Sequence, residues 1–284
     1  MHPASHPFFY STPAEPGDLP VPYTTLGEYQ IHYIHKGNGE TLIIFPDNIH
    51  AAQAYEQEIA YFSANYSVIA FDYPGFGGSS HEQHHPDEIQ VDYFGFRADL
   101  VCHLLVTHHI ESCHVLGVGG GALAALHFAG NQAFQHQLKV RSLIADSFLA
   151  DFDKRTLHRW LDTREHFYVR NIQRLETWHG NDWRMLLDRD TCFLRGLADR
   201  GGYAVPDKIL NSISCPVLLT GHLRDAALPG LAREYARLSD LIPDCTLYLS
   251  GKSGHSYLER PFAWSDPSAF RLVADLFLER VTAK

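Results

Sequence analysis

The sequence has little positive charge and no long apolar run. Lys and Arg number 23 against 33 Asp and Glu, which gives a net charge of −10 and a pI near 6.0. A protein of that sign repels polyanions, so we expect no nucleic-acid partner. No stretch approaches the roughly 18 consecutive apolar residues of a membrane-crossing helix, so we expect no membrane partner either.

Cysteine is sparse and scattered. The chain has five cysteines, an odd number, and none stands in a CxxC pair. Such cysteines are typical of small apolar fillers in a reduced interior. The first ten residues, MHPASHPFFY, lack the basic end and apolar stretch of a secretory signal. Together these absences predict a cytoplasmic protein.

What the sequence does contain is a regular alternation of short apolar runs with amphipathic stretches. We expect strands at residues 41–45, 67–72, 115–116, 140–145, 215–219 and 245–249, and helices at 51–63, 93–109, 122–129, 230–241 and 262–280. Strands that alternate with helices predict an α/β fold, in which a mostly parallel sheet is covered on both faces.

Three segments depart from this alternation. Residues 1–22 hold six prolines without periodicity, which predicts an N-terminal arm. Residues 24–35 alternate weakly and end at Lys36-Gly37-Asn38-Gly39, a pattern that favours a hairpin between two antiparallel edge strands. Residues 148–207 are rich in Trp, Arg and His, and there we expect helices and no strand.

One turn carries a recognisable pattern. The run Gly117-Val118-Gly119-Gly120-Gly121 lies between an apolar strand and a helix of small residues. A turn this tight needs residues with little or no Cβ, because its backbone is strained and the two elements pack closely. The frame resembles the nucleophile elbow G-x-S-x-G of the α/β-hydrolase superfamily, with Gly119 at the place of the nucleophile.

Three further motifs stand in register with this resemblance. Residues 71–77 (FDYPGFG) look like the superfamily's D-x-P-G-x-G loop, Asp225 follows a buried strand, and His255 follows the last strand. The order nucleophile, acid, base is that of the α/β-hydrolase fold. The resemblance implies that fold, with a core at 23–146 and 208–284 and a small helical cap at 147–207, inserted after the sixth strand.

The resemblance also implies roles for these residues. His255 would be the general base and Asp225 the acid that orients it, while Gly119 has no side chain with which to attack. The N–H of Gly120 would be one oxyanion donor.

The second oxyanion donor would come from the loop after residues 41–45. The superfamily usually has His-Gly plus one residue there, whereas this chain has Pro46-Asp47-Asn48. Asn48 would supply the donor, and Asp47 brings a carboxylate near the pocket.

Other residues have two interpretations. Ser147, beside Asp146, is an alternative nucleophile, as are Ser253 and Ser256 beside His255. The cap tryptophans are candidates for the pocket wall or for the cap's own core: Trp160, Trp178 and Trp183. The cluster His81-x-x-His84-His85 is polar and precedes a proline, which favours a solvated loop over a metal site. We expect no metal and no cofactor.

Three functional hypotheses remain open from the sequence. The first is a hydrolase-type enzyme in which His255 and Asp225 act directly as a general base pair on a small apolar or aromatic ester-like or carbonyl substrate. The second is a non-catalytic member of the fold that binds a small molecule or a protein. The third is a serine esterase whose nucleophile has been changed to Gly119. The oligomeric state is not indicated.

Overall fold

The structure is a computed structural model, which describes residues 23–80, 92–134, 136–169, 171–258 and 267–283. The predicted arm at residues 1–22 and the cluster at residues 81–85 lie outside these ranges. Among the described residues no helix is long and apolar enough to span a membrane.

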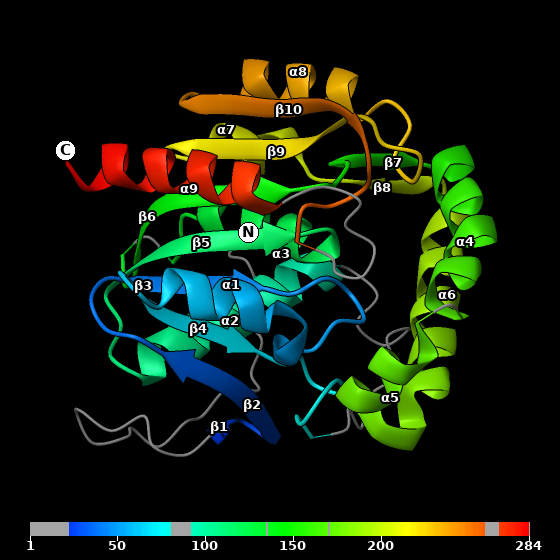
Figure 1. The fold of residues 1–284 in the computed structure, drawn as a ribbon, viewed down its shortest axis with the longest axis horizontal. Helices are drawn as coiled ribbons and strands as arrows, with labels where there is room; N and C mark the ends of the chain where they lie inside the picture. Colours follow the sequence, from blue (N-terminus) through cyan, green and yellow to red (C-terminus); the bar gives the residue numbers. More distant parts are fainter. Residues whose placement is uncertain (1–22, 81–91, 135, 170, 259–266, 284) are drawn as a thin grey trace, which may run out of the picture.

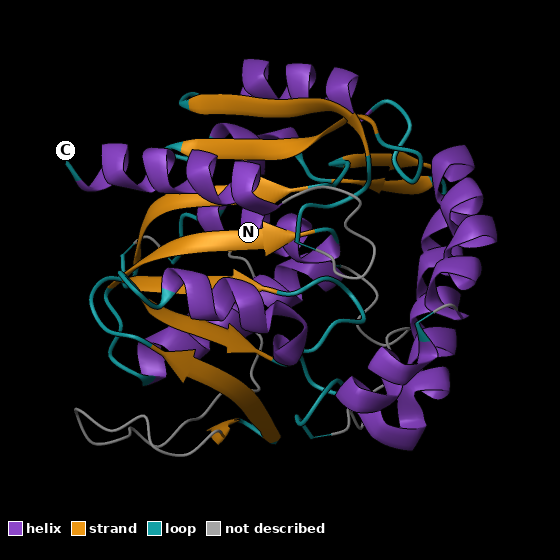
Figure 2. Ribbon diagram, viewed as in Figure 1, coloured by secondary structure: helices purple, strands orange, loops and turns teal. Residues whose placement is uncertain are grey.

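A twisted eight-stranded sheet forms the centre of the molecule (Figures 1 and 2). Its strands, in spatial order, are β1 (Tyr23–Leu26), β2 (Tyr29–Lys36), β4 (Ser67–Phe71), β3 (Thr41–Phe45), β5 (Ser112–Val118), β6 (Lys139–Asp146), β9 (Val217–Arg224) and β10 (Cys245–Ser253). The six strands from β4 to β10 run parallel, whereas β1 and β2 are antiparallel to their neighbours. The carboxyl ends of the parallel strands therefore meet at one edge, where ligand sites of such sheets form.

Helices cover both faces of the sheet (Figure 2). One face packs against α1 (Glu56–Phe62), which follows the short 3₁₀ helix η1 (Ala52–Tyr55), and against α9 (Pro267–Thr282). The other packs against α2 (Tyr93–Thr107), α3 (Gly120–Gly130), α7 (Asp207–Asn211) and α8 (Leu231–Leu241). The predicted α/β-hydrolase fold class, with a mostly parallel sheet between two helical layers, is confirmed.

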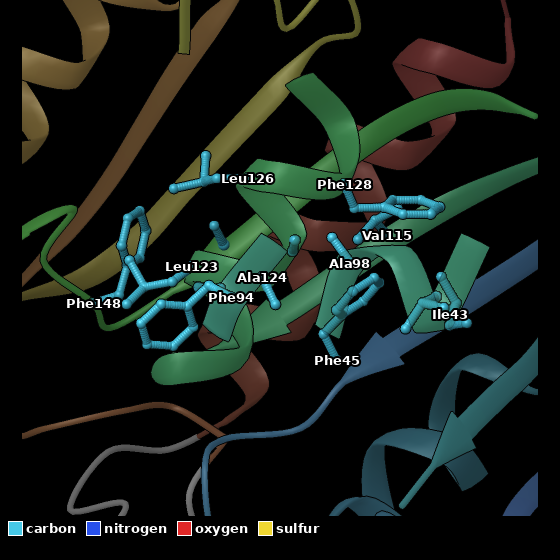
Figure 3. Close-up of a cluster of buried hydrophobic side chains, with 14 of the residues drawn as sticks. Ile43, Phe45, Phe94, Ala98, Val115, Leu123, Ala124, Leu126, Phe128 and Phe148 are labelled. Carbon is cyan, nitrogen blue, oxygen red and sulfur yellow. The ribbon is translucent and has the colours of Figure 1, made fainter. Parts of the chain in front are cut away.

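Alternating side chains of the central strands fill the two layers. In β3, Ile43 and Phe45 enter the layer with α2 and α3, while Leu42 and Ile44 enter the layer with α1 and α9. Phe45 also packs against Phe128 of α3, with 5.3 Å between ring centroids (Figure 3). Full burial of such a side chain stabilises the fold by about 1.5–3 kcal/mol, so these runs fix the register of the sheet.

The hairpin prediction at residues 36–39 was wrong in its position. The antiparallel pair is β1 with β2, and its turn lies at Gly27 and Glu28. After the glycine loop the chain enters β3, but β4 inserts between β2 and β3. Gly37 and Gly39 have positive φ because the loop passes tightly over the backbone at residues 63–66.

The predicted cap (residues 147–207) lies beyond the carboxyl ends of the strands, at the right of Figure 1. It contains α4 (Lys154–Val169), α5 (Ile172–His179), the 3₁₀ turn η2 (Gly180–Asp182) and α6 (Trp183–Asp199). The expectation of no strand there was wrong, because β7 (Asp151–Asp153) pairs with β8 (Gly202–Ala204). This two-stranded ribbon ties the two ends of the helical segment together.

Candidate functional site

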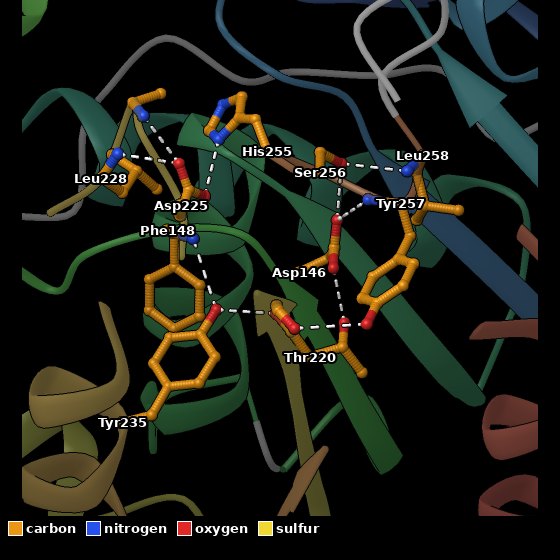
Figure 4. A network of polar contacts seen from close by, with 12 residues as sticks. Asp146, Phe148, Thr220, Asp225, Leu228, Tyr235, His255, Ser256, Tyr257 and Leu258 are labelled. Carbon is orange, nitrogen blue, oxygen red and sulfur yellow. Dashed lines mark hydrogen bonds and ion pairs between the residues drawn. The ribbon is translucent and has the colours of Figure 1, made fainter. Parts of the chain in front are cut away.

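A buried histidine and aspartate meet at the carboxyl edge of the sheet (Figure 4). Nδ1 of His255 donates a hydrogen bond to Oδ2 of Asp225 at 2.9 Å. The other oxygen, Oδ1 of Asp225, accepts from the N–H groups of Ala227 at 2.8 Å and Leu228 at 2.9 Å. Asp225 is thereby fixed as an acceptor, which places the proton of neutral His255 on Nδ1 and leaves Nε2 unprotonated.

A second buried carboxylate supports the segment that carries His255. Asp146, the last residue of β6, accepts from Oγ of Thr220 at 2.6 Å, from Oγ of Ser256 at 2.5 Å and from the N–H of Tyr257 at 3.2 Å (Figure 4). Burial raises the pKa of Asp146 to about 6, against these hydrogen bonds, which lower it. Asp146 thus anchors the chain directly after His255, which the sequence patterns did not reveal.

The elbow has the backbone expected of a nucleophile turn. Gly119 lies between β5 and α3 with φ 54° and ψ −122°, a conformation that L side chains rarely adopt. Gly121 passes so close to the loop after β3 that a Cβ there would lie 2.2 Å from the carbonyl oxygen of Phe45. Glycine at both positions therefore follows from the geometry of the turn.

The carboxylate of Asp47 occupies the space beside Gly119. A Cβ on residue 119 would lie 2.5 Å from Oδ1 and 2.6 Å from Cγ of Asp47, closer than real contacts allow. The same Oδ1 accepts the N–H of Gly120 at 2.5 Å. The group that the sequence predicts as an oxyanion donor is therefore already engaged, by a carboxylate of the facing loop.

The buried side chain of Arg97 binds Asn48 through two hydrogen bonds. Nη1 of Arg97 donates to Oδ1 of Asn48 at 2.8 Å, and Nη2 donates to the Asn48 carbonyl at 3.3 Å. The guanidinium also stacks on Tyr73 and Tyr93, at 3.9 and 4.2 Å from their ring centroids. These contacts fix the loop that presents Asp47 to the elbow.

A buried pair, Tyr55 and His50, contacts the loop at Asp47. The hydroxyl of Tyr55 accepts the N–H of Asp47 at 3.0 Å and is hydrogen-bonded to Nδ1 of His50 at 3.2 Å. Burial lowers the pKa of His50 to about 4, although the charge of Asp47 raises it. His50 is therefore neutral at pH 7, and it holds the hydroxyl that positions Asp47.

A partly open pocket joins these groups. Its wall includes every predicted catalytic and oxyanion residue except Asp225: His255, Gly119, Gly120 and Asn48. The pocket candidate Asp47 lines it as well. Trp160 of α4 also lines it, with its ring 5.7 Å from that of His255. Phe94, Leu123 and Phe148 lie close together in Figure 3 and make part of the apolar wall.

Comparison with known proteins agrees with this arrangement. Residues 43–266 match the model of a protein family described as the alpha/beta hydrolase family. The chain belongs to the alpha/beta hydrolase family. No curated protein matches the sequence.

Solved structures of hydrolases share the fold at low identity. A putative lipase from Acinetobacter baumannii AYE is 17% identical with a TM-score of 0.72, over 92% of this chain and 91% of that one. An enol-lactonase from Burkholderia xenovorans LB400 is 16% identical with a TM-score of 0.64, over 91% and 100%. The 2-hydroxy-6-oxo-6-phenylhexa-2,4-dienoate hydrolase from Rhodococcus sp. strain RHA1 is 16% identical with a TM-score of 0.68, over 89% and 96%.

Not every candidate residue of the sequence lines the pocket of this family member. Trp183 is buried in the main core, and Trp178 packs against His50 with 5.0 Å between ring centroids. Neither is among the described lining residues. Trp178 lies on α5 and Trp183 on α6, and their rings pack against other parts of the protein. The ring of Trp160 on α4 instead lies against that of His255.

Ser147 lines the pocket in an unusual conformation. Its φ is 52°, one of two positive values among the described non-glycine residues, and its N–H donates to the carbonyl of Thr220 at 3.0 Å. Its hydroxyl is buried and has no hydrogen-bond partner within the described structure. A serine nucleophile must lie within hydrogen-bond reach of its base. The described structure shows no hydrogen bond between the hydroxyl of Ser147 and His255.

A histidine at the end of α5 links the predicted cap to the core. At the end of α5, Nδ1 of His179 accepts the N–H of Gly77 at 3.0 Å, and its Nε2 donates to the carbonyl of Ile49 at 2.8 Å. Burial lowers the pKa of His179, although the hydrogen bond to Ile49 raises it. The neutral ring thus links the cap to the loops after β3 and β4.

Asp72, in the motif at residues 71–77, fixes a loop. Its Oδ1 accepts the N–H of Ala52 at 2.6 Å, and its Oδ2 accepts from Gly78 at 2.8 Å and from Nδ1 of His32 at 2.7 Å. None of these groups lines the pocket. No group of three His, Cys, Asp or Glu side chains in the described ranges is arranged to hold a metal ion.

Two charged wall residues were missed by the sequence interpretation. Arg164 of α4 and Asp190 of α6 both line the pocket and form a buried ion pair. A signal was present, because each stands on the apolar stripe of its helix. Arg164 falls in the series Leu157, Leu161, Arg164, Tyr168. A charge on such a stripe indicates a buried, paired group.

Proposed function

We propose that this family member is a hydrolase-type enzyme that uses water, activated by His255, in place of a serine. The observation that carries the proposal is the fully supported base pair. His255 and Asp225 are both buried, Asp225 has both oxygens satisfied, and His255 lines the pocket. A catalytic pair with no function would not need this support.

The chemistry requires no covalent enzyme intermediate. A water molecule gives one hydrogen bond to Nε2 of His255 and the other to the carboxylate of Asp47. Its oxygen attacks the substrate carbonyl carbon while His255 takes the proton, and the resulting imidazolium returns it to the leaving oxygen. The products are a carboxylic acid and an alcohol, so atoms and protons balance. Asp225 stabilises the imidazolium.

The developing oxyanion needs a donor, because Asp47 already takes the N–H of Gly120. Ser147 supports this role with its buried, unpartnered hydroxyl in the pocket wall and its strained backbone. Strained residues of this kind cluster at functional sites. We assign Ser147 to the oxyanion.

The substrate class follows from the wall. Leu123, Phe148 and Trp160 make it largely apolar, which favours a small apolar or aromatic ester-like or carbonyl compound. The relatives named above are a putative lipase, an enol-lactonase and a dienoate hydrolase. They are consistent with carbonyl-centred hydrolysis in a pocket of this kind.

The test is a panel of small esters, thioesters and lactones with aliphatic or aromatic acyl groups. Turnover by the wild type should fall by 10²-fold or more in His255→Ala, the typical worth of a general base, and should also fall in Asp225→Asn. Replacing His158, an exposed residue of α4, with Ala is the matched control and should leave turnover unchanged. Turnover that survives His255→Ala would exclude the proposal.

A second candidate is a non-catalytic binding protein. Its specific support is the hydrogen bond from Gly120 to Asp47, since an oxyanion site filled by the chain's own carboxylate cannot hold a substrate oxygen. This candidate expects ligand binding without turnover across the whole panel.

The third hypothesis, a serine esterase changed at position 119, has the least support. A Cβ at residue 119 meets Asp47 at 2.5 Å, so Gly119 and Asp47 fit each other as a pair.

A further inference from the structure

Two helices of the predicted cap meet at a buried ion pair. Nη2 of Arg164 donates to Oδ2 of Asp190 at 2.5 Å, and both side chains are 2% exposed. Burying two charges is favourable only when the geometry is good and the remaining polar atoms are also bonded. This pair meets the first condition and fails the second.

Three polar atoms of the pair have no partner in the described part of the chain. They are Nε and Nη1 of Arg164 and Oδ1 of Asp190. An arginine and a carboxylate that only join two helices commonly form two parallel hydrogen bonds, whereas these two share one. Each buried group left unbonded destabilises the protein, because its lost hydration is not replaced. A pocket ligand that bonds to them would recover this free energy.

The pair stands in the wall of the pocket that holds His255. Arg164 lies one helical turn after Trp160, whose ring packs against His255, so it is about 6 Å further along α4. The wall beside the pair is apolar, with Leu157, Leu194 and others. Arg164 supplies the single arginine or lysine side chain among the described lining residues.

The charges around the pair favour a neutral ligand group. Asp190 already compensates Arg164, and Asp47 adds a second carboxylate to the same pocket. A ligand carboxylate would bring a third negative charge against one cation and would leave Oδ1 of Asp190 unbonded. A primary carboxamide carries a carbonyl acceptor and an NH₂ donor group side by side. Its carbonyl accepts from Arg164 and its N–H donates to Asp190.

We propose that Arg164 and Asp190 form a subsite that anchors a carboxamide group of the substrate. The inference rests on the proposed function in that it treats this pocket as the substrate site. The substrate is then a small apolar or aromatic ester-like compound that also carries an amide. The amide is held at the cap, and the scissile carbonyl lies one helical turn away at His255.

The test is calorimetric binding of three similar probes: benzamide, benzoate and acetophenone. We expect the wild type to bind benzamide at least tenfold more tightly than the other two. The variant Arg164→Met with Asp190→Leu removes the pair without leaving a buried charge, and it should bind the three probes within about twofold of one another. The matched control, His158→Gln with Asp199→Asn, removes an exposed ion pair between the same two helices and should keep the benzamide preference.

Arg164→Lys provides a second variant if the double replacement does not fold. It keeps the charge and loses the planar donor, so it should lose at least half of the benzamide preference on a logarithmic scale. The proposal is overturned by tighter binding of benzoate, by a preference that survives loss of the pair, or by no measurable binding of benzamide. All titrations are repeated in His255→Ala, where the binding preference should persist. Loss of turnover and loss of amide recognition are thereby measured separately.

Discussion

At the scale of single residues, the site is distinguished by two positions that contact each other, Gly119 and Asp47. Gly119 has no side chain that could attack, and the carboxylate of Asp47 lies beside it and accepts the N–H of Gly120. The two positions are coupled by contact, because a Cβ on one meets the carboxylate of the other. Coupled sites of this kind give non-additive effects on mutation.

Restoring a serine should therefore fail unless Asp47 is removed as well. We expect Gly119→Ser alone to gain little esterase activity, since Asp47 crowds the hydroxyl and blocks the N–H of Gly120. Gly119→Ser with Asp47→Gly should exceed it by on the order of 10²-fold, the worth of one oxyanion donor. The measurement is p-nitrophenyl acetate hydrolysis together with labelling by a fluorophosphonate, and Asp47→Gly alone is the control. Equal activity of the single and double variants would show that the two positions are not coupled.

Ser147 gives a second prediction at this scale. Ser147→Ala should lower kcat by about 10–10²-fold with little change in KM, because the hydroxyl is assigned to an oxyanion that exists only during the reaction. Thermal stability should change little, since the hydroxyl has no partner in the described structure. The measurement is kcat and KM of both proteins with the best ester of the panel. A rise in KM at constant kcat would instead assign Ser147 to ground-state binding.

His50 predicts a pH dependence of stability. Its folded pKa is about 4 against 6.5 for a free histidine, so its stabilising neutral form is complete above pH 6.5 and is lost as the pH falls towards 4. The loss amounts to about 3 kcal/mol. Urea unfolding at several pH values should show a shallower acid loss for His50→Gln, which keeps an acceptor for Tyr55 and does not titrate. The same pH slope in both proteins would show that His50 is not the group responsible.

The positions that the sequence predicted are set by the backbone, whereas the contact that it did not predict is set by a side-chain conformation. Gly119, Asp225 and His255 were found because backbone motifs and strand order position them. The contact of Asp47 with Gly120 depends on a side-chain torsion and on the approach of two loops. No pattern along the chain reports either, so only the general expectation of a nearby carboxylate was possible.

At the scale of elements, the predicted cap is held by few polar contacts to the core. His179 joins α5 to the loops after β3 and β4 through two hydrogen bonds, and β7 with β8 forms its stem. Since α4 carries Trp160 and Arg164, the position of the cap relative to His255 sets the shape of the pocket.

Loss of His179 should therefore loosen the cap without unfolding the core. We expect His179→Ala to speed amide hydrogen exchange in α5 by about tenfold, which corresponds to the loss of one or two hydrogen bonds, while β3 and β5 keep their protection. KM for the best ester should rise. The control is His158→Ala, which lies exposed on α4. Unchanged exchange in α5 would mean that apolar packing alone holds the cap.

Element order was predictable, whereas non-local pairing was not. The buried strands and the helices between them follow from short apolar runs and 3.6-residue periods. The pairing of β2 with β4 depends on the order of strands across the sheet, and the hairpin prediction at residues 36–39 was wrong for that reason. The strands β7 and β8, of three residues each, are too short to show a period.

At the scale of the whole molecule, the sheet brings distant segments to one edge. The loop after β3, the elbow after β5, Asp225 after β9 and His255 after β10 meet because parallel strands end on the same side. The predicted cap covers this edge. The contact of His255 with Asp225 and the pocket beside it thus follow from the fold, while Gly119 is the position at which this family member differs from the serine pattern.

The most direct measurement is a single turnover of an activated ester in ¹⁸O-labelled water, followed by mass spectrometry of the intact protein and its peptides. If water activated by His255 attacks the substrate, the label appears in the acid product, the protein carries no acyl adduct at any time, and Asp47 gains no label. An acyl adduct on Ser147, or ¹⁸O in the carboxylate of Asp47, would show that the chain supplies its own nucleophile and would contradict direct attack by water.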